Sequence, residues 1–270
     1  MVFTYYPFLR NFQIGLYQSP PFPGLPSKFV GTQQFTSMLS SPIFWDCVKT
    51  TALFVVFVVP LGVFGGLVMA VMAHQRLKGI QIYRTIFSST VVSSAAVAAL
   101  VFEAFVSPVN GYLRALGIHV SDLTVNPTWS LPVVALVSAW QFVGLAFIIF
   151  TAGLQSVPDD IMEAARVDGA SSWTRLWRVT LPLLSPTVFF CIVVGVIFSL
   201  QSFGQIDIMV TSPNSAFAHT NVLIYYVYQL LRVQQNPGLA ACYSVALFVI
   251  TLVVTLIQFR LLEKRVHYGN

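Results

Sequence analysis

Long runs of apolar residues without a charged side chain dominate the sequence. A transmembrane helix needs about 20 such residues, because each adds about 1.5 Å and the hydrocarbon core is about 30 Å thick. Strands of a membrane barrel would alternate apolar and polar residues over about 10 positions, and these runs do not. They therefore predict five membrane-spanning helices. The runs cover residues 50–73, 85–102, 129–157, 179–206 and 233–259.

The N-terminal segment, residues 1–17, is apolar but is interrupted by Pro7, Arg10 and Asn11. It lacks the basic start and small-residue cleavage site of a secretory signal. We expect it to form the outer half of a first transmembrane helix whose inner part is missing or lies upstream. An interfacial amphipathic segment is the alternative. The fold class is thus an all-α membrane protein, residues 1–270 forming a single transmembrane domain with about six helices, the first incomplete or atypical.

The composition agrees with this class. Apolar residues make up 56% of the chain and charged residues only 9%, whereas soluble domains carry about 25% charged residues. The 14% share of aromatic residues demands burial and excludes intrinsic disorder. The 3 cysteines include no CxxC pair, so neither a disulfide framework nor a zinc site is expected.

Positive charge is concentrated in alternate connecting segments. Residues 74–84, 166–178 and 260–265 hold nine of the 14 Lys and Arg residues, and the positive-inside rule places such segments in the cytoplasm. The C-terminus is therefore expected in the cytoplasm. The net charge of +5 reflects this topology, since no basic stripe that would bind nucleic acid is present.

One of these cytoplasmic segments, residues 156–182, has the pattern of two short helices rather than a linker. Ser156 is expected to cap the first helix, whose opening turn carries two carboxylates. Gly169 supplies a left-handed stop, and Ser171 or Ser172 can cap the second helix.

The second helix has one apolar side, because Trp173, Leu176 and Trp177 follow the i, i+3, i+4 spacing. Such a surface suits docking into a groove of a soluble partner. It equally suits a pair of helices that rest on lipid headgroups. The spacing alone favours neither reading.

The sequence EAARVDGASSWTRLWRVTLPLLSP, residues 163–186, resembles the EAA motif of binding-protein-dependent ABC importer permeases. The similarity lies in Glu-Ala-Ala, then three residues and a glycine, then Leu-Pro about a dozen residues further on and a second proline. Residues 225–228 resemble carbohydrate-uptake permeases of the maltose-transporter type, and residues 258–270 resemble the A subunit of glycerol-3-phosphate importers. One departure is residues 211–214, where relatives often show Thr-x-Gly-Gly-Pro.

The resemblance implies a subunit of the bacterial inner membrane without catalysis of its own. A second permease subunit would complete a heterodimer, an extracytoplasmic binding protein would deliver the cargo, and a cytoplasmic ATPase dimer would hold ATP and magnesium. The chain would bind no cofactor, and it contains no GxxxxGK[ST] sequence. Carried over by position, the residues that couple to the ATPase are Glu163, Ala164, Ala165, Asp168 and Gly169.

Candidate residues for the substrate pathway are polar side chains inside the spans, where polarity is costly. Amides and a hydroxyl can bond a polyol or a phosphate. Alternatively they bond neighbouring helices or line the interface between subunits. His119 and His219 lack a ligand-spaced partner, so no metal site is expected. The pathway candidates are Gln141, Gln201, Ser202 and Gln205.

The resemblance favours glycerol-3-phosphate or a glycerophosphodiester as cargo, with a sugar such as trehalose or a maltodextrin as the alternative. A carrier driven by an ion gradient would usually show charged residues deep in its spans, and these spans have almost none. A membrane enzyme would need a nucleophile with a base, or clustered carboxylates and histidines, and neither is present in the sequence pattern.

Overall fold

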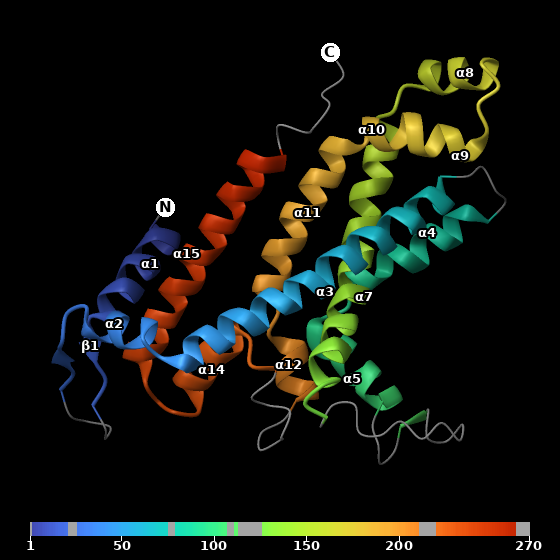
Figure 1. Ribbon diagram of the computed structural model, residues 1–270. Helices are drawn as coiled ribbons and strands as arrows, with labels where there is room; N and C mark the ends of the chain where they lie inside the picture. Colours follow the sequence, from blue (N-terminus) through green and yellow to red (C-terminus); the bar gives the residue numbers. More distant parts are fainter. Residues whose placement is uncertain are drawn as a thin grey trace.

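The computed structural model describes residues 2–20, 26–74, 79–106, 111–112, 126–210 and 220–262. Helices form almost all of this part of the chain (Figure 1). A two-stranded antiparallel ribbon pairs β1 (Tyr17–Gln18) with β2 (Lys28–Phe29). The helices are α1 (Val2–Gly15), α2 (Gln33–Leu39), α3 (Pro42–Ala73), α4 (Ile80–Ser89), the 3₁₀ turn η1 (Thr90–Val92), α5 (Ala95–Val106), α7 (Ser130–Gln155), α8 (Asp159–Val167), α9 (Ser172–Arg175), the π-helical η2 (Leu176–Thr180), α10 (Leu181–Leu183), α11 (Ser185–Leu200), α12 (Gly204–Met209), α14 (Leu223–Arg232) and α15 (Pro237–Leu262).

Three helices are single segments long and apolar enough to cross a membrane, namely α3, α7 and α15. Two further spans are possible if each of two bent helix pairs counts as one. Residues 80–92 and α5 meet at 105°, and residues 172–183 meet α11 at 67°. The all-α membrane fold is therefore confirmed.

The run at residues 85–102 is not the continuous helix that its apolar pattern predicts. It breaks at Ser93 and Ser94, between η1 and α5. The Gln141 side chain of α7 donates a hydrogen bond to the Ser93 carbonyl oxygen at 2.8 Å, so a side-chain amide satisfies this carbonyl at the break. Irregular backbone is tolerated at membrane depth where neighbouring helices satisfy its polar groups in this way.

The centre of the bundle is α7, the most buried of the three long helices. It packs along α3, where glycines permit close approach. A methyl group added at Gly62 would overlap the Phe142 ring, and one added at Gly66 would lie 2.9 Å from the backbone of α7 at Phe147 N. The outward faces of α3 and α15 carry large apolar side chains such as Phe64 and Leu256, which suit contact with lipid.

The N-terminal helix α1 packs on α15 (Figure 1). The rings of Phe8 and Phe248 have centroids 4.7 Å apart, and the Cys242 thiol donates to the Gly15 carbonyl oxygen at 3.4 Å. With 14 residues, α1 is about 21 Å long, which is shorter than a hydrocarbon core. Both interpretations of this segment, half of a span or an interfacial helix, stay predictions.

Candidate functional site: the loop between α7 and α11 and the polar pair in the spans

The first helix of the loop, α8, begins at Asp159 rather than at a serine cap. The prediction that Ser156 caps it is wrong: the Ser156 hydroxyl donates to the Gly153 carbonyl oxygen at 2.8 Å and ends α7. Pro158 occupies the N-cap position in an extended conformation, and the ring fixes its φ at −61°. Asp159 and Asp160 follow in the first turn, where the positive end of the helix dipole stabilises them.

The bend after α8 is a Schellman motif centred on Gly169. Gly169 has a φ of +74°, as the sequence predicts. Its N–H donates to the Arg166 carbonyl oxygen at 3.0 Å, and the Ala170 N–H donates to the Ala165 carbonyl oxygen at 3.1 Å. These two bonds satisfy the last carbonyls of α8 and require a left-handed residue between them.

The second helix begins with the predicted serine cap. The Ser171 hydroxyl accepts a hydrogen bond from the Thr174 N–H at 3.2 Å. The helix then continues from α9 through the π-helical η2 into α10, before the 67° bend to α11. The Ser172 hydroxyl is instead the partner of Arg175 Nη2, at 3.1 Å.

The five residues carried over from the EAA motif lie along the last turns of α8 and the bend. Glu163, Ala164, Asp168 and Gly169 are exposed, and Ala165 is half-buried. No described residue forms an ion pair with either carboxylate, since the ion pair found in the described part of the chain joins Lys49 to Asp46. Two carboxylates and a small-residue surface therefore face outward, free of intramolecular ion pairs.

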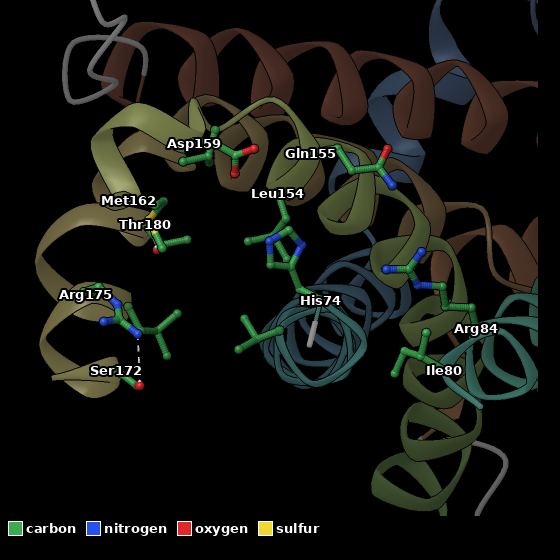
Figure 2. A pocket seen from close by; sticks show the side chains of 13 residues that line it. His74, Ile80, Arg84, Leu154, Gln155, Asp159, Met162, Ser172, Arg175 and Thr180 are labelled. Atoms are coloured by element: carbon green, nitrogen blue, oxygen red, sulfur yellow. Dashed lines mark hydrogen bonds between the residues drawn. The ribbon is translucent and has the colours of Figure 1, made fainter. Parts of the chain in front are cut away.

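A cavity of about 460 Å³ separates this loop from the ends of α3 and α7 (Figure 2). The Arg84 guanidinium on one side donates to the Ala73 carbonyl oxygen at 2.9 Å and caps α3. On the other side the Thr180 hydroxyl donates to the Met162 sulfur at 3.8 Å and links η2 to α8. The remaining lining residues are Val71, His74, Ile80, Leu154, Gln155, Val157, Asp159, Ser172, Arg175 and Leu176.

Two of the four pathway candidates are brought into direct contact. Gln205 Nε2 donates to Gln141 Oε1 at 2.7 Å, which joins α12 to α7. Gln205 is only 2% exposed, and its Oε1 has no hydrogen-bond partner among the described residues. Ser202 is also buried, whereas Gln201 is exposed and ends α11. The amides thus bond neighbouring helices, and one buried acceptor is left over.

Sequence reasoning grouped Phe203 with these amides, but it did not connect them with two tyrosines of α14 that contact Phe203. Phe203 lies two residues before Gln205, and its ring centroid is 5.0 Å from that of Tyr228. Tyr225 and Tyr228 stack with centroids 6.1 Å apart. Burial raises the pKa of Tyr225, and the hydrogen bond with Gln229, which lowers the pKa, offsets only part of this shift, so the phenol stays protonated and can donate a hydrogen bond. The signal in the sequence was the Tyr-Tyr-Val-Tyr run of α14.

Several features expected from the sequence lie outside the described residues. These are His119, His219, residues 211–214 and most of the basic C-terminal segment. Within the described residues, no three His, Cys, Asp or Glu side chains lie together as a metal site would require. The three cysteines are buried and unpaired.

Comparison with known proteins gives the family. The model of binding-protein-dependent transport system inner membrane components matches residues 62–268. The chain belongs to this family. One relative is the sn-glycerol-3-phosphate transport system permease protein UgpA of Rhizobium meliloti (strain 1021), 34% identical over 274 residues, with 100% of this chain and 92% of the relative covered.

Other relatives carry different names. The lactose transport system permease protein LacF of Rhizobium radiobacter is 28% identical over 271 residues, with 98% of this chain and 90% of LacF covered. A bacterial alginate ABC transporter, solved in complex with an alginate pentasaccharide-bound periplasmic protein, has a TM-score of 0.84 at 21% identity. The alignment covers 100% of this chain and 91% of the transporter chain, and it shows that the two chains share a fold.

Proposed function

We propose that this chain is a non-catalytic permease subunit of an ATP-driven importer, and that α8 with its bend couples it to a cytoplasmic ATPase dimer. The observation that carries the proposal is the exposed surface of Glu163, Ala164, Asp168 and Gly169 at the end of the helix. Small side chains allow close approach to a groove, and the two carboxylates can pair with Arg or Lys of the ATPase. ATP and magnesium would be bound by that partner, and this chain would bind no cofactor.

The other partners follow from the same assignment. A second permease subunit would complete a heterodimer, because one bundle of this size encloses half of a pathway. An extracytoplasmic binding protein would deliver cargo to the face opposite the coupling loop. The solved alginate transporter is described with such a periplasmic protein, which supports this arrangement for a chain of the same fold.

For the cargo we propose glycerol-3-phosphate or a glycerophosphodiester. Support comes from relatives named as glycerol-3-phosphate permeases, two of which are 34% and 36% identical to this chain. The lactose permease relative makes a sugar the second candidate. Both cargo classes present at least two hydroxyl groups, which hydrogen-bonding side chains of the pathway can bind.

The proposed contacts for those hydroxyls lie at Gln141, Gln201, Ser202 and Gln205. The unpartnered Oε1 of Gln205 is an acceptor that a hydroxyl can reach only if the pathway opens towards α12. A buried acceptor without a donor costs about 1–3 kcal/mol, so binding a hydroxyl there would be favourable. Phe203 and Tyr228 would supply an apolar wall for the carbon skeleton.

The test is ATP hydrolysis by the reconstituted complex with its sister permease, ATPase and binding protein. Glycerol-3-phosphate, glycerophosphocholine, trehalose and maltose would be offered in turn. Stimulation by the phosphate compounds supports the first cargo class, and stimulation by a sugar alone selects the second. Glu163→Gln should weaken binding of the ATPase, while Asp160→Asn, an exposed acid one turn earlier, should not. Failure of the wild type to bind the ATPase would refute the importer assignment.

Orientation has its own test. Val167 is 87% exposed at the end of α8, so Val167→Cys should react readily with a membrane-impermeant maleimide. We expect labelling in inside-out vesicles and none in right-side-out vesicles. The opposite result would place the loop outside the cell.

A further inference from the structure

The coupling loop, which links α7 to α11, has two arms of opposite charge. The acidic arm, α8 with its bend, holds Asp159, Asp160, Glu163 and Asp168 against the single cation Arg166. The second arm, residues 171–183, holds two arginines and no acid, together with a pair of tryptophans. The acidic arm suits a cationic protein groove. The second arm has a different character and needs a different partner.

The tryptophan pair is exposed and presented on one side of the second arm. Trp173 and Trp177 are 69% and 53% exposed, and their ring centroids lie 5.5 Å apart. The side chains that line the cavity come from another side of the same arm, at Ser172, Arg175, Leu176 and Thr180. In Figure 2 Arg175 and Thr180 point towards that cavity. The described residues therefore leave most of the Trp173 surface and about half of the Trp177 surface uncovered.

Arg178, which follows Trp177 in the sequence, adds an exposed positive charge to the same arm. Arg175, by contrast, is half-buried and donates to the Ala170 carbonyl oxygen at 3.1 Å and to the Ser172 hydroxyl. One arginine thus holds the bend together, and the other is exposed. An exposed surface with two indoles, one free guanidinium and no carboxylate complements an anionic, partly apolar layer.

The direction of the second arm brings it towards the plane of a membrane. It meets α11, which belongs to a candidate span, at an angle of 67°. Thr180 near the end of the arm and Leu184 at the bend to α11 are buried, whereas Pro182 between them is exposed. In Figure 1, α8 lies at the far end of the molecule and α9 is drawn between α8 and the spans. The second arm therefore leaves the bundle at the level where a span ends.

We propose that Trp173, Trp177 and Arg178 bind the anionic phospholipid headgroups of the leaflet that the coupling loop faces. That leaflet is the cytoplasmic one if the proposed function is correct. Indole rings favour the interface between hydrocarbon and water, since their faces are apolar and their N–H groups find polar partners there. An arginine beside them keeps its charge at the phosphates. The acidic arm is repelled by the same layer and is left for the protein partner.

The anchor fixes one side of the Gly169 bend relative to the membrane. The cap at Ser171 and the Arg175 bonds make the second arm rigid from the bend to η2. Movement of the acidic arm would then pivot about Gly169 rather than displace the whole loop. As a consequence, the second arm would stay fixed to the membrane while the acidic arm moves.

The experiment compares a nitroxide label on each arm of the assembled importer in nanodiscs that contain phosphatidylglycerol. Trp177→Cys places the label on the second arm, and Val167→Cys is the matched exposed apolar position on the acidic arm. The native cysteines are buried, so their background is measured on the unsubstituted protein. Collision with oxygen reports lipid, and collision with a water-soluble nickel chelate reports solvent.

We expect oxygen collisions to exceed nickel collisions at position 177, and few collisions with either reagent at position 167, because the acidic arm docks on the ATPase. Low accessibility to both reagents at 177 would show that the tryptophan pair docks on the ATPase, and nickel-dominated collisions would show a solvated surface; either result overturns the proposal. Trp173→Cys repeats the measurement should the first variant fail to assemble. A further experiment replaces phosphatidylglycerol with phosphatidylcholine. In these nanodiscs Arg178 should lose its anionic partner, and the label at position 177 should become more mobile. These readouts need no cargo and no knowledge of the leaflet, so they stand apart from the tests of the proposed function.

Discussion

The bend at Gly169 can be perturbed without disturbing any packing. No atom lies within 4 Å of the position that a Cβ would occupy there, so a new side chain meets open space. What changes is the backbone, since φ is +74° and an L-residue pays roughly 1–2 kcal/mol in the left-handed region. A β-branched residue costs more, because its second γ-substituent crowds the backbone.

The magnitude follows from this difference. About 1.4 kcal/mol corresponds to a factor of ten in an equilibrium, so Gly169→Val should reduce the ratio of bent to unbent loops by roughly tenfold or more. Gly169→Ala should cost somewhat less, and Gly169→Asn least, because asparagine tolerates the left-handed conformation. Cargo-stimulated ATP hydrolysis in proteoliposomes should fall in the same order.

A matched control separates the bend from general instability. Gly31 also has a positive φ, +58°, with no atom within 4 Å of its would-be Cβ, but it lies between β2 and α2, in a different part of the chain from the coupling loop. Gly31→Val should lower the melting temperature to a similar extent and leave the stimulated rate per assembled complex unchanged. The reasoning is refuted if Gly169→Val keeps wild-type stimulation, or if valine and asparagine at position 169 reduce it equally.

Three further predictions concern stability and coupling. Gln141→Leu removes the donor to the Ser93 carbonyl oxygen and should destabilise the solubilised protein by about 1–3 kcal/mol, measured as a lower melting temperature. Gln205→Leu should destabilise the protein less. A double-mutant cycle should show that the two amides are energetically coupled. Gly66→Ala forces a methyl group against the backbone of α7 and should reduce the yield of folded protein in detergent by size exclusion, more than Gly65→Ala, whose methyl meets only a side chain. Ser171→Ala deletes the cap of the second helix and should cost about 1 kcal/mol of stability while retaining most of the stimulated ATP hydrolysis; a loss as large as that of Gly169→Val would contradict the pivot at the bend.

Features set by local sequence were predictable. Three of the five apolar runs, residues 50–73, 129–157 and 233–259, correspond to single long helices, since the need to satisfy backbone polar groups in lipid leaves few alternatives. The left-handed glycine and the Ser171 cap followed from residue types whose conformations are dictated by neighbours within four positions. The Ser156 cap was wrong because Pro158, two residues later, takes the extended conformation that starts α8.

Features set by distant partners were not predictable. The break at Ser93 depends on an amide 48 residues later in the chain, and the Gln205 contact spans 64 residues. A polar residue inside an apolar run indicates that a partner exists, but the run itself does not identify it. The cavity beneath the coupling loop likewise depends on how the ends of α3 and α7 meet η2. The spacing of apolar residues along the chain does not predict how these three elements meet.

The coupling loop is connected to α12, which carries Gln205, through the single helix α11. With 16 residues α11 is about 24 Å long, and it joins the second arm at one end to Gln201 and α12 at the other. A helix of this length can move as a rigid body that pivots at Leu184, the buried residue at the bend. If the ATPase moves the loop as proposed, the far end of α11 would move with it and draw Gln205 away from Gln141, while Gln141 would keep its bond to the Ser93 carbonyl oxygen. Labels at the two ends of α11 should accordingly keep their separation through the ATP cycle, while the distance from its far end to α7 changes.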